Sequence, residues 1–488
     1  MFEKIRNAQS VWIYGIGRIG KRICQIFEYC NISVEGIVVS SKSQNISSYR
    51  GVEVYELDAI SDKNALIVIA ADGKVQIEIQ DYLEQNGYFN YMVWTDELLC
   101  EIWKTSEYIF ENRQQGKEKV CLVLSGYKDF LWPIVYQRLA KFVPADTEVC
   151  ICSAGLYSEE LSDLAAQYGW SYLSTSVNSV SLIQNITISL YDSAQWIYKM
   201  DEDVFITENA FDYIYELYNQ CEKDMPYKIG YVAPLILVNG FCYRYILEKY
   251  GKLEDFESRF GKAYIGGNSD LEIVKNPDAA KYMWGEGGMP VLDTMAKELA
   301  SGTGHLLANV RFSIGFMLFK REMWNAMMGY EVLGNKDLGV DEEDVGRFCM
   351  NESRAIVVAK NALVGHFSFG KQTAAMRKYF DEHHEQFEIN SCHYTSVALC
   401  GYREKGRILY EKLCSEGVSI PYIIERNYQS LSYWESDLES KIVGFQESKE
   451  FYNQADAVLL TGDLPDAVIR EALELAGINL PIITEIEV

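Results

Sequence analysis

Short apolar runs alternate with stretches of helical periodicity over most of this chain, and this alternation restricts its fold more than any other feature. Strands that alternate with helices form parallel sheets covered by helices, because the connection between two parallel strands has room for a helix. The pattern therefore predicts an α/β fold. In the first hundred residues the candidate strands are VWIYG (11–15), ISVEGIVV (32–39), ALIVIAA (65–71) and YFNYMVW (88–94).

The end of the chain resembles its beginning. VALCGYREKG (397–406) matches VWIYGIGRIG (11–20) at a constant offset of 386, and the first and last glycines of the earlier segment align with the two glycines of the later one. The apolar positions that follow match without a gap. We therefore expect two copies of one Rossmann-like module. The expected domains are a Rossmann-like domain at 1–115, a central domain at 118–385 and the second Rossmann-like copy at 392–488.

The 488 residues include 45 Lys and Arg against 70 Asp and Glu, which gives a net charge of −25. A surface this acidic repels phosphates, so no nucleic-acid partner is expected. The twelve cysteines are scattered and form no CxxC pair, which is typical of reduced, buried thiols. The N-terminus has no signal-peptide core, and no apolar run approaches the roughly 20 residues of a membrane span. These features predict a cytoplasmic protein, with peripheral attachment at the inner face of the membrane left open.

The acidic segment YKMDEDVFI (198–206) follows the fourth candidate strand of the central domain. Ligands of open α/β sheets bind at the carboxyl ends of strands. Residues two apart in an extended segment point to the same side, so Asp201 and Asp203 can address one cation together. Mg²⁺ and Mn²⁺ bind one or two protein carboxylates and complete their shells with phosphate oxygens. An acidic turn without a ligand is the alternative explanation.

Three segments of the central domain resemble family 2 glycosyltransferases, which have the GT-A fold. The stretch from VCLVLSGYKDF (120–130) to NSVSLIQNITISLYDSAQWIYKMDED (178–203) is similar to their nucleotide-binding half. SIGFMLFKREMWNAMMGYEVLGNKDLGVDEEDVGRF (313–348) resembles their acceptor-side block, and GHFSFG (365–370) their late histidine segment. The resemblance covers about 118–370. It implies a central GT-A-type nucleotide-diphospho-sugar transferase domain between the two Rossmann-like α/β domains.

The resemblance also implies roles for individual residues. Asp201, Asp203 and His366 match the positions that hold Mn²⁺ or Mg²⁺ in the family. Ser125 and Tyr127 follow the first strand, where the nucleobase packs, and Asn185 lies in the helix before the acidic motif. The expected donor-binding residues are therefore Ser125, Tyr127, Asn185, Asp201 and Asp203.

The catalytic base is expected in the acidic run 341–344. A sugar hydroxyl is a poor nucleophile, and a carboxylate that accepts its proton assists the attack on the anomeric carbon. Asp344 matches the base of the family. Glu343 and Asp341 remain alternatives, and solvated carboxylates at the start of a helix would give the same pattern.

The acceptor site is less specific in sequence. Sugar rings stack on aromatic faces, so Trp284 and Trp324 are candidate acceptor contacts, although ordinary core packing is the better explanation for each tryptophan taken singly. An insertion at about 227–310 separates the two acidic motifs and is placed to shape the acceptor side. The expected partners are a nucleotide-diphospho-sugar donor and a glycan or lipid-linked acceptor, with a homodimer left open.

GIGRIG (15–20) matches the dinucleotide fingerprint, in which glycines let a pyrophosphate approach a helix N-terminus. The acid that should end the second strand is replaced by Ser40. In the second copy Arg403 replaces the middle glycine, while Glu425 supplies the acid. Because each copy lacks a different part, NAD(P) is not expected, and scaffold or docking roles are favoured.

The leading hypothesis is an inverting, metal-dependent glycosyltransferase, with synthesis of a bacterial surface polysaccharide as its setting. One alternative is an NAD(P)-dependent oxidoreductase that acts on sugars through GIGRIG. Another is a non-catalytic protein that binds a nucleotide-sugar or a glycan. Transfer activity, NADH binding and metal-dependent ligand binding distinguish the three.

Overall fold

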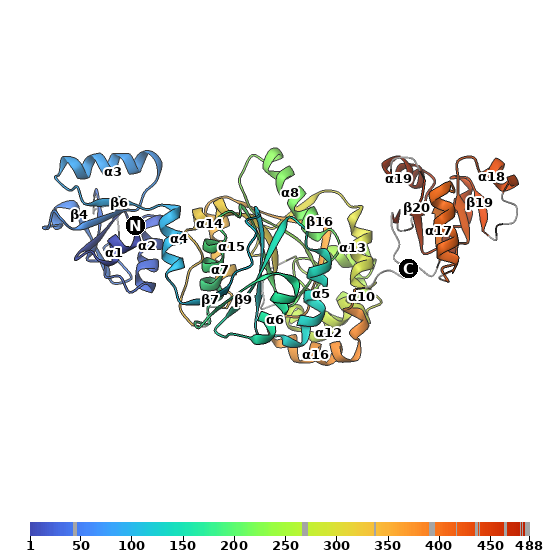
Figure 1. The fold of residues 1–488 in the computed structure, drawn as a ribbon, viewed down its shortest axis with the longest axis horizontal. Coiled ribbons are helices and arrows are strands. Elements are labelled where there is room, and N and C mark those ends of the chain that lie inside the picture. Colours follow the sequence, from blue (N-terminus) through green and yellow to red (C-terminus); the bar gives the residue numbers. More distant parts are fainter. Residues whose placement is uncertain are drawn as a thin grey trace. The chain divides into compact units, whose positions relative to one another are not determined.

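The structure is a computed structural model. It describes residues 1–41, 46–265, 272–335, 338–389, 396–415, 417–434, 438, 440–462, 466–478, 480 and 482–483. It shows a mixed α/β fold with three sheets, most of whose strands run parallel, so the α/β expectation is confirmed (Figure 1). By compactness the chain divides into two units, 1–289 with 303–383 and 290–302 with 384–488. The expected domain start at 392 lies outside the described residues.

The N-terminal sheet has the strand order β3-β4-β2-β1-β5-β6. All its neighbours pair in parallel except β3, which pairs antiparallel with β4. The helices α2 (Arg18–Tyr29) and α3 (Gly73–Gln85) lie on opposite faces (Figure 1). A short α1 (Phe2–Arg6) precedes the sheet. Its strands are β1 (Val11–Tyr14), β2 (Gly36–Val39), β3 (Ser48–Tyr49), β4 (Val52–Glu56), β5 (Leu66–Ile69) and β6 (Tyr91–Val93).

The C-terminal sheet is fully parallel, in the order β19-β18-β17-β20-β21. The helix α19 (Asp466–Leu475) packs on one face and α17 (Glu404–Ser415) on the other. The helix α18 (Tyr428–Trp434) precedes β19. The strands are β17 (Val397–Cys400), β18 (Tyr422–Ile424), β19 (Lys441–Val443), β20 (Ala457–Leu460) and β21 (Ile482–Ile483).

These two sheets agree in detail. Leaving out β3, their strand orders are the same, and β17 and β18 begin 386 residues after β1 and β2. Gly15 and Gly401 both turn the chain after the first strand, with φ of +108° and +107°. Their amides donate to Val38 and Ile424, which are again 386 residues apart.

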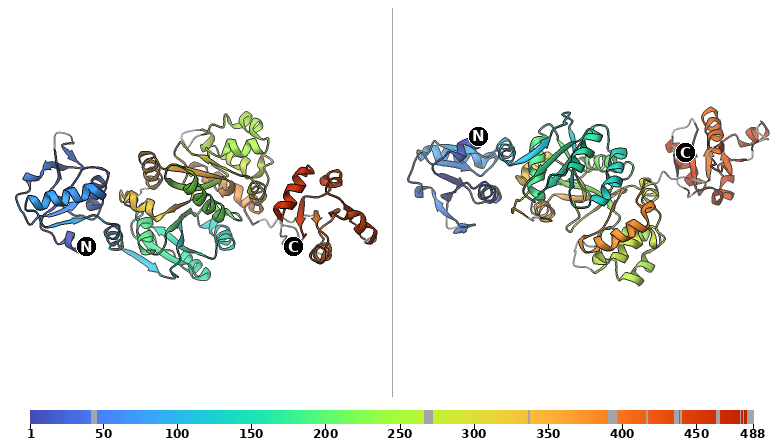
Figure 2. Two further views of the ribbon diagram at one scale, coloured as in Figure 1. Left: turned by 90° about the horizontal axis from the view of Figure 1, so that it is seen from above. Right: turned by 60° about the horizontal axis from the view of Figure 1, so that its bottom comes forward.

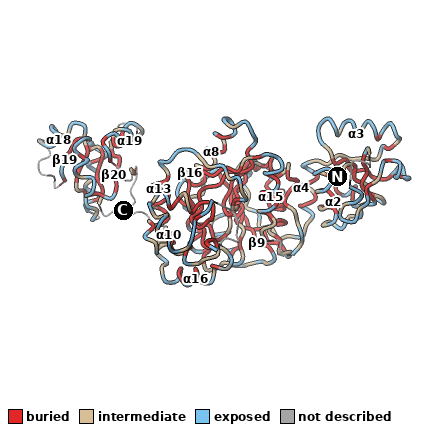
Figure 3. Tube along the Cα trace, turned by 180° about the vertical axis from the view of Figure 1, so that it is seen from behind, coloured by how far each residue is buried: buried red, intermediate tan, exposed pale blue. Residues whose placement is uncertain are grey.

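The central sheet combines a parallel half with a mixed half (Figure 2). In the parallel half the order is β10-β9-β8-β11, and β7 pairs antiparallel with β10 at the edge. The strands β9 and β16 are buried along most of their length, as Figure 3 shows. The strands of the parallel half and its edge are β7 (Tyr108–Glu111), β8 (Lys119–Ser125), β9 (Thr147–Ala154), β10 (Ser171–Thr175) and β11 (Trp196–Asp201).

The mixed half continues from β11 through β15, β13 and β16 to β12, and β14 also pairs with β16. Since β13 belongs to this sheet, the helical insertion begins after it, later than the expected start near 227. The strands are β12 (Val204–Phe205), β13 (Ile229–Ile236), β14 (His305–Leu307), β15 (Phe316–Lys320) and β16 (Ala355–His366).

Helices cover the central sheet on both sides (Figure 2). The helix α7 (Val180–Leu190) is the most deeply buried, since only its first and last residues retain partial exposure. The others are α4 (Asp96–Lys104), α5 (Trp132–Phe142), α6 (Glu159–Tyr168), α8 (Ala210–Asp224), α9 (Tyr243–Lys249), α10 (Leu253–Phe260), α11 (Glu272–Lys275), α12 (Pro277–Lys281), the π-helix η4 (Tyr282–Glu286), α14 (Arg321–Met327), α15 (Val340–Asn351) and α16 (Thr373–Glu382). The helix α13 (Leu292–Ala300) belongs to the second compact unit.

The first sheet ends earlier than the expected boundary at 115. Tyr108–Glu111 forms β7 and pairs with β10, so this segment already belongs to the central sheet. Across the described parts of the chain, no helix has both the length and the apolar character needed to cross a membrane.

Candidate functional site

The strand order of the central sheet puts a topological switch point, the usual position of the crevice in open α/β sheets, at the carboxyl ends of β8 and β11. From β8 the chain proceeds to β9 and β10 on one side, while β11 lies on the other side of β8. The loops after β8 and β11 therefore lead in opposite directions, and ligands of open α/β sheets bind at such a switch point. The acidic segment 201–203 stands at this position.

Glu202, the middle acid of the segment, holds the loop after β8. Its carboxylate accepts hydrogen bonds from the backbone amides of Gly126 (2.8 Å) and Tyr127 (3.0 Å) and from the indole of Trp132 (2.7 Å). Burial raises the pKa of Glu202, and these hydrogen bonds oppose that shift. Glu202 thus fixes the loop after β8 and points to a different set of partners from Asp201 and Asp203.

Asp203 lies beside His366 because of strand pairing. Val204 of β12 pairs with His366 at the end of β16, and the amide of Phe367 donates to the carbonyl of Asp203 at 2.9 Å. His366 Nε2 is 3.4 Å from Asp203 Oδ2, and Lys128 donates from its ammonium group to the same oxygen. Two residues that are 163 positions apart in sequence are thus brought together with a lysine from the β8 loop.

The charges in this cluster balance locally. Burial opposes ionisation of Asp203, yet the charges of His366 and Lys128 keep its pKa below the usual value. Burial raises the pKa of Asp201 to about 6, against the effect of Lys199, whose ammonium donates to Asp201 Oδ1 at 2.6 Å. Burial lowers the pKa of His366, while Asp203 opposes that shift. Each aspartate therefore has its own lysine.

The acids of α15 separate into three environments. Asp341 is buried and accepts a hydrogen bond from Gln184 of α7 at 2.9 Å. The charge of Asp341 also contributes to raising the pKa of Asp201 and of Lys199. Glu343 is exposed and pairs with Arg311 at 3.1 Å.

Asp344 has partners that differ from those of Asp341. Its Oδ2 accepts from Arg22 (2.6 Å) and from the amide of Glu331 (2.8 Å), and its Oδ1 accepts from Arg347 (3.2 Å). Three donors, one of them the part-buried guanidinium of Arg22, thus hold this carboxylate, whereas Asp341 has the side-chain amide of Gln184 as its partner.

Two of the expected ligand contacts have structural roles instead. Asn185 and Trp324 are fully buried and hydrogen-bonded to each other at 3.0 Å. Asn185 also exchanges hydrogen bonds with the backbone of Tyr330. These side chains connect α7 to α14 and the loop after it, so neither of them reaches a donor or an acceptor in this structure.

The remaining expected residues differ in accessibility. The Ser125 hydroxyl is buried against that of Tyr136. Tyr127 is 62% exposed beside the crevice, and its hydroxyl donates to the Ala154 carbonyl. Trp284 is buried, with its indole N–H on the carbonyl of His366, so it supports the histidine and offers no stacking face.

Asp203 and His366 are the two residues here that could hold a divalent ion. An octahedral ion with bonds of roughly 2.1 Å needs adjacent ligand atoms about 3 Å apart, close to the separation of Asp203 Oδ2 and His366 Nε2. No three His, Cys, Asp or Glu side chains gather closely enough to bind a metal within the described residues. The pair therefore fits an ion whose other ligands come from a substrate diphosphate, once Lys128 moves aside.

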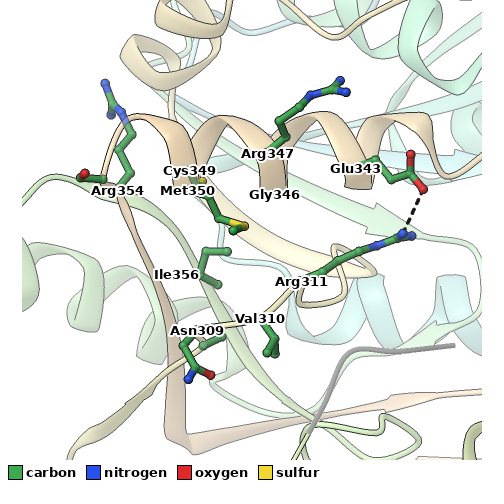
Figure 4. A pocket seen from close by; sticks show the side chains of 12 residues that line it. Asn309, Val310, Arg311, Glu343, Gly346, Arg347, Cys349, Met350, Arg354 and Ile356 are labelled. Carbon is green, nitrogen blue, oxygen red and sulfur yellow. Dashed lines mark hydrogen bonds and ion pairs between the residues drawn. The ribbon is translucent and has the colours of Figure 1, made fainter. Parts of the chain in front are cut away.

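A cavity of about 570 Å³ lies along the exposed face of α15, away from the acidic cluster (Figure 4). Arg311 reaches toward Glu343 at this cavity, as Figure 4 shows. Its lining includes Val310, Met350 and Ile356. The cavity shares α15 with Asp341 but uses the opposite face of the helix, so it is separate from the crevice.

The two glycine-rich turns are engaged within the protein. At the end of β1, the Tyr14 hydroxyl is hydrogen-bonded to Ser40 at 3.1 Å, where a dinucleotide site would have an acid. In the second copy, Glu425 accepts from the amide of Tyr402 at 3.0 Å. In a dinucleotide site the amides of this turn approach the pyrophosphate. Here the amide of Tyr402 is already hydrogen-bonded to the Glu425 carboxylate.

Four contributors to the site were missed from sequence. Lys128 directly follows Tyr127, and Lys199 stands two residues before Asp201 on the same strand face, so their spacing was a usable signal. Gln184 and Arg22 gave no signal, because their partners lie 157 and 322 residues away.

Comparison with known proteins identifies only distant similarity. No family model matches the sequence, and neither does any curated protein. Two crystal structures of the glycosyltransferase GlyE from Streptococcus pneumoniae, one of them the apo form, are similar at a TM-score of 0.25. The identities are 9% for the apo form and 10% for the other, over 75% of this chain and 90% and 91% of GlyE. Similarity this distant does not indicate a function for this chain.

Proposed function

We propose that this protein is an inverting glycosyltransferase that uses a nucleotide-diphospho-sugar. The observation that carries the proposal is the convergence of Asp203, His366 and Lys128 at the switch point between β8 and β11. This cluster combines a carboxylate and an imidazole, both able to bind a metal ion, with the ammonium group of Lys128, a composition suited to a diphosphate. Asp341 is a buried carboxylate at the start of α15, held by Gln184 of α7.

The residues divide into donor and acceptor functions. Asp203 and His366 would hold Mn²⁺ or Mg²⁺, which supplies positive charge to the departing diphosphate. Lys128 transfers its hydrogen bond from Asp203 to a phosphate oxygen when the donor binds. Tyr127 offers an exposed ring to the nucleobase next to the loop held by Glu202.

Asp341 accepts the proton of the acceptor hydroxyl in this proposal. The oxygen then bonds to the anomeric carbon, the bond from that carbon to the diphosphate breaks, and the diphosphate leaves with its electron pair. One displacement on the face opposite the leaving group inverts the configuration at the anomeric carbon. Gln184 holds the Asp341 carboxylate in position.

The biological setting extends the same proposal. A glycan or lipid-linked acceptor, a role in bacterial surface polysaccharide synthesis, a cytoplasmic location with peripheral membrane contact, and a homodimer are consistent with a sugar transferase. Each depends on the transfer reaction itself, which is therefore the first property to test.

The test is a screen of nucleotide-diphospho-sugars for transfer and for slow hydrolysis, with and without Mn²⁺. Asp203→Asn should abolish metal-dependent turnover, whereas Asp278→Asn, a change at an exposed carboxylate on α12, should retain it. Equal turnover in Asp203→Asn and in the unaltered protein would refute the proposal.

A further inference from the structure

One face of α2, a helix of the N-terminal Rossmann-like part, contacts α14, the loop after α14 and α15 within the same compact unit. Arg18, Arg22 and Gln25 are spaced by four and three residues, so they lie on one side of the helix. Arg18 donates to the Ala326 carbonyl and pairs with Glu352 at 3.0 Å. Arg22 donates to the Met327 carbonyl at 3.2 Å and to the Asp344 carboxylate at 2.6 Å. Gln25 donates to the Glu331 carboxylate at 2.7 Å.

The Arg22–Asp344 pair is the most buried of these contacts. The side chains are 11% and 5% exposed, so both charges are largely withdrawn from water. A largely buried ion pair fixes the relative position of its two side chains, because its hydrogen bonds require a defined geometry and an unpaired buried charge is destabilising. The same Asp344 oxygen accepts from the amide of Glu331, so the pair connects α2, the loop before α15 and α15 itself.

Asp341 and Asp344 are three residues apart near the start of α15, so a shift of this part of the helix moves both carboxylates. This part of α15 is held from two sides. Gln184 of α7 holds Asp341, and Arg22 of α2 holds Asp344. Within the central part, Arg347 is a weaker partner for Asp344, since it is 56% exposed and lies at 3.2 Å.

We infer that Arg22 is a positioning residue for the site, through which the N-terminal Rossmann-like part holds α15 so that Asp341 keeps its position against Gln184. The inference rests on the proposed transferase function for its catalytic consequence. It also gives GIGRIG a purpose. The start of α2, where a pyrophosphate would bind, instead directs Arg18 to the Ala326 carbonyl and Glu352.

The experiment compares Arg22→Met with Lys21→Met in the full chain. Both changes remove one positive charge from neighbouring positions of α2, but Lys21 is exposed and packs over the Tyr49 ring. Amide exchange in 326–331 and 340–350 should become about tenfold faster in Arg22→Met and stay unchanged in Lys21→Met. For transfer, kcat should fall about 10–100-fold in Arg22→Met while the donor KM stays within about twofold, because a misplaced base slows chemistry without weakening donor binding.

Arg22→Lys provides the rescue. A lysine keeps the charge for Asp344 but cannot also reach the Met327 carbonyl with a second nitrogen, so exchange and kcat should lie between those of Arg22→Met and the unaltered protein. If Arg22→Met fails to fold, the same measurements on Arg22→Lys against Lys21→Arg decide the question.

Unchanged exchange in both segments for the Arg22 variants overturns the inference. A fall in donor affinity equal to the fall in kcat also overturns it, because that result assigns Arg22 to general stability. If exchange responds as expected but even the unaltered protein transfers no sugar, the docking role of Arg22 stands and the proposed function fails.

Discussion

At the scale of single residues, the site depends on how each carboxylate is neutralised. Asp201 pairs with Lys199, Asp203 with Lys128 and His366, and Asp344 with Arg22 and Arg347. Asp341 has an amide partner, Gln184. The proposed base thus has a neutral partner, whereas the other three carboxylates each have a cationic one.

Lys128→Met should strengthen the binding of Mn²⁺ to the protein without donor. A divalent ion must displace the ammonium group from Asp203, and removing that competing charge should lower the Kd about tenfold, or about 1.4 kcal/mol. Titration followed by electron paramagnetic resonance of Mn²⁺ measures the change, with Lys119→Met as the control at an exposed ion pair with Asp146. Equal Mn²⁺ affinity in both variants would show that Lys128 does not compete with the ion.

Asp341→Asn and Asp344→Asn should fail in different ways. Loss of the base should lower kcat about 100–10,000-fold with little change in melting temperature. Loss of the charge opposite buried Arg22 should cost about 3 kcal/mol of stability, with a smaller effect on the residual activity of the folded protein. Calorimetry and single-turnover kinetics on both variants measure the two effects. The opposite pattern would return Asp344 to the role of base.

At the scale of elements, strand order places the chemistry. The carboxyl ends of β8 and β11 adjoin because β9 and β10 lie on the other side of β8, and the antiparallel pairing of β12 with β16 brings His366 to Asp203. The two glycine-rich turns serve close packing, since a Cβ on Gly20 would stand 2.0 Å from the Gly15 carbonyl oxygen, and one on Gly406 would stand 2.4 Å from that of Gly401.

Gly20→Ala should destabilise the N-terminal sheet by about 1–3 kcal/mol, because the added methyl group overlaps the turn before α2. Gly17→Ala is the matched control in the same motif. A Cβ there meets nothing within 4 Å, so its cost should stay below about 1 kcal/mol, the size of a helix-cap effect. Hydrogen exchange in 11–39 reports the difference locally. Equal protection in the two variants would contradict the packing role of Gly20.

At the scale of the whole molecule, ligand binding should appear as increased stability. The correct nucleotide-diphospho-sugar with Mn²⁺ at a hundredfold excess over Kd should stabilise the site-bearing unit by about 2.7 kcal/mol. A chelator should remove most of this gain, and Asp203→Asn should prevent it. A thermal-shift screen measures these changes, and NADH is the informative comparison. Stabilisation by NADH with none by any sugar nucleotide would favour the oxidoreductase alternative.

Much of this organisation could be predicted from sequence because it depends on local pattern. Apolar runs and helical periodicity predicted an α/β chain, and the glycine spacing pointed to two related sheets. The prediction was less accurate where a segment pairs with a strand that is far from it in the sequence. Tyr108–Glu111 pairs with β10 and Ile229–Ile236 with β15 and β16, and neither pairing leaves a local signal.

The sequence by itself determined the alternation of strands and helices, the glycine turns and the acidic segment at a strand end, because each depends on residues close together in the chain. The tertiary structure alone decided which side chains meet. It brought Asp203 next to His366 and buried Asn185 against Trp324. It also paired Asp344 with Arg22, which is 322 residues away in the sequence. Such pairings depend on strand order and on helix packing between sheets, and a carboxylate acquires its chemical role only from the charges placed beside it.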